Sequence, residues 1–412
     1  MSLSNIKQLI AKEVKRQQTG LIMIASENYC SKEALAATGS PLSNKYSEGY
    51  PGKRYYSGNE YIDQIEVLAQ KSCLKMFDLK GDKWHANVQP HSGSSANLAV
   101  YLGLLQPGDK ILAMDLSHGG HLTHGSPVNF SGKLFKFAHY GVDEKTQLID
   151  YEKLEKIALK EKPKMIVCGA TAYPRKIDFR KFAAIAKKTG ALLLADISHI
   201  AGLIAADAHP SPFPYADIVT STTHKTLAGP RSALIICRIE LAKEIDKAIF
   251  PGLQGGPMEN VISGKAICFE EAITSKFKKI QLQTVKNAAV LAELLKKNGI
   301  KLVSGGTDNH LLLLDLRPQN ISGKTAADIL AEADIYTNAN MIPYDPAKPL
   351  NPSGLRLGTA ALSTRGMKEK EMRLIGLWIA EILKTPNDKK LRSRIKNEVH
   401  VLTKKFPIYP IK

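Results

Sequence analysis

The stretch Ser221-Thr-Thr-His-Lys-Thr-Leu-Ala-Gly-Pro230 places one lysine, Lys225, just beyond a short apolar run that begins at Asp217 and reaches Val219. Hydroxyl side chains and one histidine surround this lysine in the sequence. A second apolar run, Ala191 to Ala195, leads directly into Asp196. Because such runs are typical of buried strands, we expect a lysine and a carboxylate at the ends of two neighbouring strands.

Similar apolar runs alternate with helical stretches from about residue 60 to residue 270. Continuous apolar strands separated by helices predict an α/β domain with a mostly parallel sheet covered by helices on both faces. In such sheets ligands bind at the carboxyl ends of the strands, where Asp196 and Lys225 are expected. The predicted strands are Ala86–Val88, Lys110–Met114, Met165–Cys168, Ala191–Ala195, Asp217–Thr220 and Ala233–Ile236.

The chain outside this region predicts a helical arm and a smaller domain. An amphipathic helix opens the sequence and ends near Gly20. After the glycine-rich connection at residues 251–257, a long helical stretch runs to about Asn298. A strand at residues 310–316 and helices near 324–332 and 368–384 then predict an α+β fold. We therefore expect an N-terminal arm at residues 1–20, a large α/β domain at 21–275 and a small C-terminal α+β domain at 276–412.

Composition excludes several classes of protein. The 412 residues are 44% hydrophobic and 23% charged, as in ordinary globular chains. No apolar stretch approaches a membrane span, the N-terminus does not resemble a signal peptide, and the five cysteines form no CxxC pair. The net charge of +18 is dispersed over lysines without the arginine–aromatic pattern of an RNA-binding sheet. We expect a cytoplasmic location with neither a membrane nor a nucleic acid partner.

Lys225 and Asp196 together indicate a pyridoxal phosphate site. The amine of a lysine can form a Schiff base with an aldehyde, and a carboxylate can keep a pyridine nitrogen protonated. Taken alone, this pair is equally consistent with a surface lysine and an unrelated aspartate. Ser92, Gly93 and Ser94 follow a predicted strand and open a helix, where backbone amides favour a phosphate. Taken by itself, that segment is also an ordinary serine-rich helix cap.

Three histidines lie at spacings of three in the stretch from His118 to His124. Imidazoles are common zinc ligands. However, Gly119, Gly120 and Pro127 favour a loop, and no nearby carboxylate or cysteine completes a ligand set. We expect no metal, and we expect one imidazole to stack on the cofactor ring.

Two further segments carry polar groups suited to binding or proton transfer. The stretch from Lys45 to Tyr56 combines four tyrosines with Glu48 in a loop rich in glycine and proline. It suits either proton transfer or tyrosine packing at an interface, and both hold if the loop completes a neighbouring subunit's site. Arg356 stands between small residues and suits a substrate carboxylate, although an arginine in a salt bridge fits the pattern equally.

Six segments in order resemble the serine hydroxymethyltransferase family over nearly the whole chain. The resemblance implies the aspartate aminotransferase-like fold, pyridoxal 5'-phosphate as cofactor and tetrahydrofolate as co-substrate. It also implies a homodimer or a dimer of dimers with active sites shared between subunits. The segments are residues 24–29, 44–56, 86–94, 118–127, 222–231 and 304–310.

The resemblance also implies a role for each matching residue. Lys225 would be the Schiff-base lysine, Asp196 would pair with the pyridine nitrogen and His121 would stack on the ring. Glu48 and Tyr56 would be catalytic and would also contact the substrate, together with Ser26 and Arg356. The further cofactor contacts would be Ser92, Gly93, Ser94, Thr171, His199, Thr222 and His224, with Tyr46, Gly255 and Gly256 supplied by the partner subunit's copy. The folate site would be lined by Tyr55, Leu116, Leu122 and Asn340.

The implied reaction is the reversible transfer of the serine hydroxymethyl group to tetrahydrofolate, giving glycine and 5,10-methylenetetrahydrofolate. A folate-independent aldolase of threonine or other β-hydroxy amino acids is the nearest alternative, and an RNA-binding protein on an inactive scaffold is the second. The chain departs from the family's usual residues near the lysine loop, the substrate arginine and the folate site, which bears most on folate affinity. These departures are Ser198, Ser232, Ala233, Ala339 and Ala360.

Overall fold

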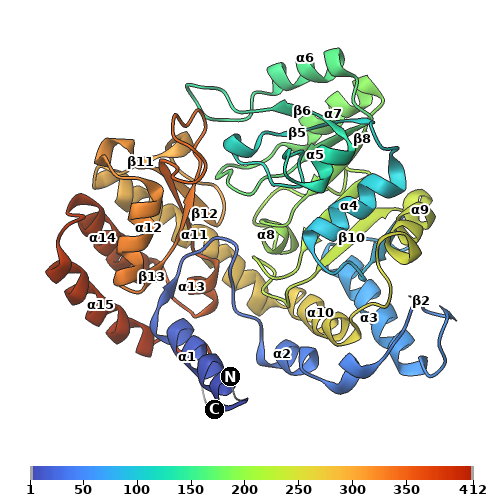
Figure 1. The fold of residues 1–412 in the computed structure, drawn as a ribbon, viewed down its shortest axis with the longest axis horizontal. Helices are drawn as coiled ribbons and strands as arrows, with labels where there is room; N and C mark the ends of the chain where they lie inside the picture. The colour runs from blue at the N-terminus through green and yellow to red at the C-terminus, as the bar shows by residue number, and fades with distance from the viewer. Residues whose placement is uncertain (1–2, 410–412) are drawn as a thin grey trace. The chain divides into compact units, whose positions relative to one another are not determined.

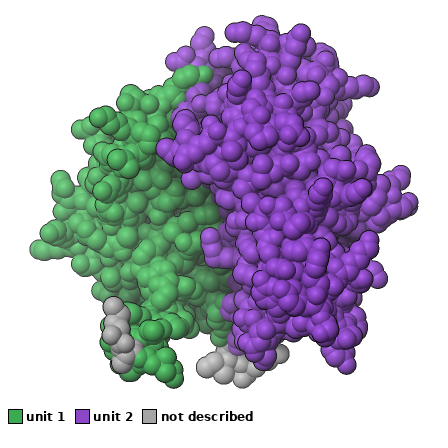
Figure 2. All heavy atoms as spheres, turned by 45° about the vertical axis from the view of Figure 1, so that its right-hand side comes forward, with its two compact units in different colours: residues 1–29, 283–412 green, residues 30–282 purple. Residues whose placement is uncertain are grey.

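The computed structural model describes residues 3–409 and divides the chain into two compact units. Unit 1 combines residues 1–29 with 283–412, and unit 2 comprises residues 30–282 (Figure 2). The domain boundaries expected after residues 20 and 275 stay predictions. Among residues 3–409, no helix is long and apolar enough to cross a membrane.

Unit 2 is built on a seven-stranded sheet with the order β4-β10-β9-β8-β7-β5-β6. Strands β5, β6, β8 and β10 of this sheet are labelled in Figure 1. Strand β10 runs antiparallel to both of its neighbours, and the pairs among the other strands are parallel. The predicted fold class, an α/β fold with a mostly parallel sheet, is therefore confirmed. The strands are β4 (Trp84–Asn87), β5 (Lys110–Met114), β6 (Lys136–Tyr140), β7 (Met165–Cys168), β8 (Leu192–Asp196), β9 (Ile218–Thr222) and β10 (Ala233–Arg238).

Strand residues on both faces of this sheet are buried, as the continuous apolar runs require. Ile111 and Ala113 of β5 belong to one core cluster. Leu112 and Met114, which alternate with them along the strand, are buried as well. Successive strand side chains point to opposite faces, so both faces must be covered. The helices of unit 2 are α2 (Lys32–Thr38), α3 (Glu60–Met76), α4 (Gly93–Leu104), α5 (Phe130–Leu134), α6 (Tyr151–Glu161), α7 (Phe179–Thr189), α8 (Ala201–Ala205), α9 (Ala242–Lys247) and α10 (Glu259–Ala272).

The long helical stretch expected after residue 257 is two helices, α10 and α11 (Ser275–Lys297). The break falls at Thr274, whose hydroxyl accepts a hydrogen bond from the backbone N–H of Phe277 at 3.2 Å. A threonine that caps a helix in this way starts a new helix instead of continuing the old one. Helix α11 runs across the division between the two units.

Unit 1 contains a four-stranded antiparallel sheet with the order β11-β12-β15-β14 and a parallel pair of β1 with β13. The strands are β1 (Leu21–Ile22), β11 (Lys301–Leu302), β12 (Leu311–Asp315), β13 (Ile335–Tyr336), β14 (Asn338–Asn340) and β15 (Gly354–Gly358). The helices are α1 (Leu3–Thr19), α12 (Gly323–Glu332), α13 (Ala360–Thr364), α14 (Glu369–Lys384) and α15 (Lys389–Lys404).

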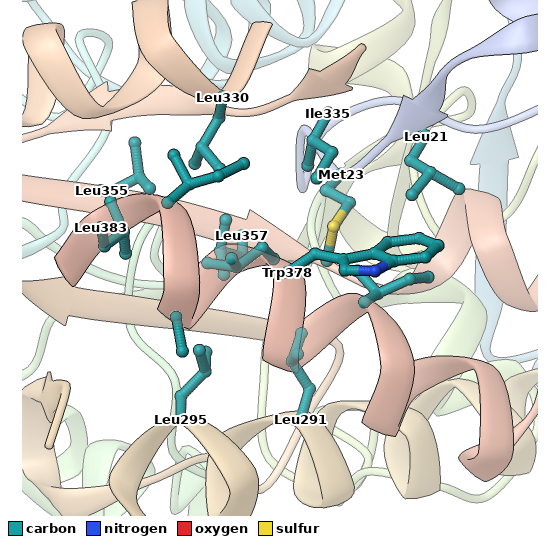
Figure 3. Packing of buried hydrophobic residues seen from close by; sticks show 14 of the residues in the cluster. Leu21, Met23, Leu291, Leu295, Leu330, Ile335, Leu355, Leu357, Trp378 and Leu383 are labelled. Carbon is teal, nitrogen blue, oxygen red and sulfur yellow. The ribbon is translucent and has the colours of Figure 1, made fainter. Parts of the chain in front are cut away.

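The core of unit 1 explains why the first residues of the chain belong to it. Leu21 and Met23 lie in one buried cluster with Leu291 of α11, Leu357 of β15 and Trp378 of α14 (Figure 3). The pairing of Leu21 with Ile335 adds a backbone connection to β13. The N-terminal segment is thus fixed by apolar packing against residues that lie more than 250 positions further along the chain.

Helix α1 confirms the amphipathic helix predicted before Gly20. It buries no side chain, and its apolar residues Ile6, Leu9, Ile10 and Val14 are all exposed in the single chain. An amphipathic helix normally buries its apolar stripe against another element. This stripe is therefore an apolar surface that the described chain leaves uncovered.

Candidate active site

Asp196 and Lys225 lie at the same edge of the sheet in unit 2. Asp196 is the last residue of β8, and Lys225 follows the last residue of β9 by three positions. The two strands are parallel, with Asp196 opposite Thr220. The carboxyl ends of neighbouring parallel strands meet at one edge, so the predicted proximity follows from the register.

The carboxylate of Asp196 is buried among hydrogen-bond donors from its own unit. Asn97 of α4 donates to Oδ2 at 2.9 Å, and Nε2 of His124 lies 3.3 Å from the same oxygen. The backbone N–H of Ser198 donates to Oδ1 at 3.1 Å. A buried carboxylate with three such partners is held in one orientation as an acceptor.

These partners keep Asp196 charged. Burial alone would raise the pKa of Asp196. Hydrogen bonds from His124 and Asn97, together with electrostatic attraction from His124 and His121, outweigh this effect and hold that pKa well below the usual range. Burial lowers the pKa of His121 to about 4, with a smaller effect of His124. At neutral pH the site therefore combines an ionised carboxylate with a neutral imidazole.

The partners of Asp196 were not among the predicted site residues. Asn97 also donates to Oγ1 of Thr123 at 2.8 Å and accepts from the hydroxyl of Thr220 at 2.7 Å. Thr123 in turn lies 2.7 Å from Nδ1 of His121. The available signal was one polar residue, Asn97, in an otherwise small and apolar stretch of α4.

Lys225 contacts the end of β9. Its amine donates to Oγ1 of Thr222 at 3.1 Å. The backbone N–H of Thr222 donates to Oγ of Ser198 at 3.0 Å, which ties the segment after β8 to the end of β9. A Cβ atom on Gly93 would lie 2.7 Å from Cγ2 of Thr222. Only glycine allows this close approach of α4 to the strand end.

The N-terminus of α4 and the side chain of His224 are each suited to an anion. Ser92 is the N-cap of α4, and its hydroxyl accepts from the backbone N–H of Ser95 at 3.2 Å. The N-terminus of a helix favours negative charge, and Ser94 lies in its first turn. Nδ1 of His224 is buried without a hydrogen-bond partner, and burial lowers the pKa of this histidine to about 3. These features fit the phosphate of the implied cofactor.

Two further predicted residues follow strands of the same edge. Thr171 comes three residues after β7, and its backbone N–H donates to the carbonyl of Gly119 at 2.7 Å. His199 comes three residues after β8, and its carbonyl accepts from the hydroxyl of Thr226 at 3.0 Å. Both are therefore near the strand ends that carry Asp196 and Lys225.

The three histidines serve different neighbours. Nδ1 of His118 accepts from the backbone N–H of Val142 at 3.1 Å, while His121 contacts Thr123 and His124 contacts Asp196. Within residues 3–409, no group of three or more His, Cys, Asp or Glu side chains is placed to hold a metal ion. Leu116, two residues before this stretch, and Leu122, within it, are expected in the folate site, and both are exposed.

The loop from Lys45 to Ser57 in unit 2 contains four of the predicted residues: Tyr46, Glu48, Tyr55 and Tyr56. It contains a short hairpin of β2 (Gly49–Tyr50) and β3 (Lys53–Arg54). The hydroxyl of Tyr46 donates to Oε1 of Glu48 at 3.2 Å, and the Tyr46 and Tyr56 rings meet edge to face at 5.0 Å. A Cβ on Gly255 would lie 3.1 Å from Oε1 of Glu48, and one on Gly256 would lie 3.3 Å from the Tyr46 ring.

The remaining predicted residues belong to unit 1. Arg356 is buried in β15, where its Nε donates to Oδ1 of Asn338 at 3.2 Å. Burial lowers the pKa of Arg356 to about 10. Asn340 lies on the neighbouring strand β14, and Ser26 follows β1.

Comparison with known proteins identifies the family. The family model described as serine hydroxymethyltransferase matches residues 2–379. The chain belongs to the serine hydroxymethyltransferase family. A serine hydroxymethyltransferase of Nostoc sp. (strain PCC 7120 / SAG 25.82 / UTEX 2576) is 54% identical over 406 residues, covering 98% of this chain and 94% of the relative. Another, from Methanosarcina barkeri (strain Fusaro / DSM 804), is 54% identical over 403 residues, covering 98% of this chain and 97% of the relative.

Membership in the serine hydroxymethyltransferase family confirms the predicted family and activity. The chain is a transferase that interconverts serine and glycine with tetrahydrofolate as the one-carbon carrier. The folate-independent aldolase is not favoured by these matches.

Two of the departures from the family's usual residues have visible contacts. Ser198 accepts the hydrogen bond from Thr222 described above. Ser232 donates to the carbonyl of Pro90 at 2.9 Å, and the backbone N–H of Ala233 donates to the same oxygen at 3.2 Å. Both serines thus add hydrogen bonds between segments that carry predicted site residues, while nothing in the structure explains Ala339 or Ala360.

Proposed function

We propose that Lys225 and Asp196 form the centre of a pyridoxal phosphate site. Lys225 would hold the cofactor covalently through its amine, and Asp196 would hold a proton on the pyridine nitrogen. The observation that carries this proposal is the buried, ionised Asp196 at the end of β8, beside the strand that leads to Lys225. Bound pyridoxal phosphate supplies an electron sink for the bond that breaks in the substrate.

The other contacts of the cofactor would come from the same strand ends. Gly93, Ser94 and the N-cap Ser92 would hold the phosphate at the start of α4, with His224 and Thr222 beside it. His121, neutral at physiological pH, would cover the ring. Thr171 and His199 would lie beside its polar substituent.

Glu48 would handle the proton of the serine hydroxymethyl group, with Tyr56 beside it. A carboxylate is an effective proton donor or acceptor when a hydrogen bond fixes its direction, as that of Tyr46 does here. Tetrahydrofolate would accept the one-carbon group at a surface lined by Tyr55, Leu116 and Leu122, all exposed in the single chain. The family resemblance also implies Asn340 as a folate contact.

Arg356 would bind the carboxylate of serine, with Ser26 as a second contact. A planar guanidinium offers two parallel N–H donors to a carboxylate, and burial strengthens that interaction. The part of serine that becomes glycine would thus be held in place by its carboxylate while the hydroxymethyl group leaves.

The active form would be a homodimer, or a dimer of dimers, in which the loop from Lys45 to Ser57 completes the partner's site. Tyr46, Tyr55 and Tyr56 are 54%, 75% and 46% exposed, and the apolar stripe of α1 is exposed as well. Surfaces this rich in apolar and aromatic groups are typical of interfaces between subunits. Tyr46, Gly255 and Gly256 would then meet the phosphate in the partner's site.

Two measurements test this proposal. Borohydride reduction of the protein loaded with pyridoxal phosphate, followed by peptide mass mapping, should place the cofactor on the peptide that contains Lys225; attachment to another lysine would contradict the proposal. Glycine formation from serine should depend on added tetrahydrofolate. Equal rates with and without it would favour the aldolase instead.

A further inference from the structure

A buried ionic network lies directly behind the loop that carries Glu48. We call it the Arg54 network; its members are Arg54, Asp63, Glu66, Gln89 and Glu259. The Arg54 side chain is only 4% exposed although its loop is at the surface. Because a buried guanidinium must satisfy its N–H donors within the protein, its partners show what it holds.

Arg54 holds the backbone on both sides of Glu48. Its Nη1 donates to the carbonyl oxygen of Ser47 at 2.8 Å and to that of Gly49 at 2.9 Å. The carbonyl of Glu48 itself accepts from the backbone N–H of Tyr55 at 3.0 Å. Three consecutive carbonyls are therefore fixed, so the Glu48 peptide has one available orientation.

Acidic side chains from two helices fix the guanidinium in turn. Nη2 of Arg54 lies 2.6 Å from Oε2 of Glu66 on α3, and Nε lies 2.8 Å from Oδ1 of Asp63 on the same helix. Oε1 of Glu259 on α10 is 3.9 Å away and accepts from the Ser47 hydroxyl at 2.6 Å. The contacts of Arg54 with Glu66 and Asp63 are charge-assisted hydrogen bonds, which are among the stronger hydrogen bonds in proteins.

Gln89 joins the same network to the segment that precedes the N-terminus of α4. Its Nε2 donates to the carbonyl of Gly49 and to Oε1 of Glu66, both at 2.9 Å. Its own carbonyl accepts from Gln254 at 3.0 Å, and Gln254 is followed by Gly255, which adjoins Glu48. The loop is thus fixed relative to the two glycines against which Glu48 and Tyr46 lie.

A purely stabilising role is the simpler explanation, but it accounts poorly for these contacts. Replacing a buried ion pair with apolar side chains is often neutral or stabilising, so such pairs add little net stability. Their distinctive property is directional geometry, and here that geometry is applied to the two peptides around one carboxylate. We infer that Arg54 is a positioning residue that sets the direction of the Glu48 side chain. This inference rests on the proposed role of Glu48.

A double-mutant cycle tests the inference with the cofactor-loaded protein. Arg54→Lys should lower kcat for glycine formation with tetrahydrofolate by about 30- to 100-fold, since a small misplacement of a reacting group costs that much. The KM for serine should change by less than about threefold, because the proposed main contact of serine is that of its carboxylate with Arg356. In a Glu48→Gln background, Arg54→Lys should lower kcat by less than about twofold, because its effect runs through Glu48.

Arg238→Lys is the matched control. Arg238 is also in unit 2, where its guanidinium lies 4.2 Å from the Trp84 ring and donates to the carbonyl of Phe213 at 3.3 Å. This variant should keep kcat. If Arg54→Lys lowers kcat by the same factor with and without Glu48→Gln, or does not lower it at all, the inference is wrong.

If the Arg54→Lys protein does not fold, Asp63→Asn replaces it in the same double-mutant test. Asp63 is partly exposed and holds both Nε of Arg54 and the backbone N–H of Gly52, so its loss should loosen the loop more mildly. We expect a loss of about three- to tenfold in kcat that disappears in the Glu48→Gln background; an undiminished loss there would overturn the inference. Full kcat in Glu48→Gln alone would show instead that the proposed role of Glu48 is wrong, and the inference with it.

Discussion

The end of the sheet around Asp196 and the loop around Glu48 are organised in opposite ways. Asp196 is buried and takes its donors from α4, the His121 stretch and the segment after β8. Glu48 has a rigid, buried support in the Arg54 network, but the tyrosines beside it are exposed. The first region holds its carboxylate with groups of the same chain. The second holds a half-buried carboxylate beside exposed tyrosines, which suits the proposed contact with a partner subunit.

The largest effect should come from the sheet end. Lys225→Ala removes the amine that would hold the cofactor, so glycine formation should fall on the order of 10⁴-fold or more. The assay is glycine formation from serine with tetrahydrofolate at saturating pyridoxal phosphate. Activity within tenfold of the wild type would show that the lysine at the end of β9 is not the anchor.

Asp196→Asn should have the next largest effect. Asparagine keeps the size of the side chain but removes the charge that would hold the pyridinium proton, so kcat should fall by about 10²- to 10³-fold. Asp217→Asn is the control. Asp217 accepts a hydrogen bond from the backbone N–H of Leu193 and lies just before the start of β9, whereas Lys225 lies beyond the end of that strand. Equal losses in both variants would point to folding instead of chemistry.

In the loop, Glu48→Gln should lower kcat by about 10²-fold by removing a proton acceptor while keeping its shape. The loss should be seen with tetrahydrofolate present and with little change in cofactor binding, followed by visible absorbance. Glu60→Gln, a change at an exposed glutamate in the first turn of α3, is the control. An unchanged kcat would show that Glu48 takes no part in the chemistry.

The smallest effect concerns stability in acid. The unfolded chain binds a proton on His121 near pH 6.5, whereas the folded chain does so only near pH 4, so acid favours unfolding in this window. Between pH 7 and pH 5 the cofactor-free wild type should lose about 2 kcal/mol more unfolding free energy than a His121→Asn variant does. Urea unfolding at both pH values measures this difference. Equal losses of unfolding free energy in the wild type and the His121→Asn variant would show that the imidazole is not buried in the folded chain.

The sheet end could be predicted from local sequence to a large extent. Asp196 and Lys225 follow apolar runs, and the parallel register brings such ends together without further information. The observed β8 and β9 lie within about two residues of the predicted strands. Strand β6 was missed because its residues are mixed in polarity and it lies at the edge of the sheet.

Long-range contacts were beyond the reach of the sequence patterns. Asn97 and His124 contact Asp196 from 99 and 72 positions away, and a two-residue strand such as β1 carries no periodic signal for its pairing with β13. The ionic support of Glu48 likewise depends on Glu259, which lies 212 positions from Ser47. The site roles, the homodimer and the cytoplasmic location stay predictions.

Subunit mixing tests the central claim most directly. Lys225→Ala and Glu48→Gln proteins are mixed in equal amounts, allowed to exchange subunits and assayed for glycine formation with tetrahydrofolate. If the Glu48 loop serves the partner's site, each mixed dimer has one intact site, and activity should recover to about a quarter of the wild type. Activity that stays at the level of the separate variants after exchange would show that Lys225 and Glu48 act within the same chain and would contradict the account.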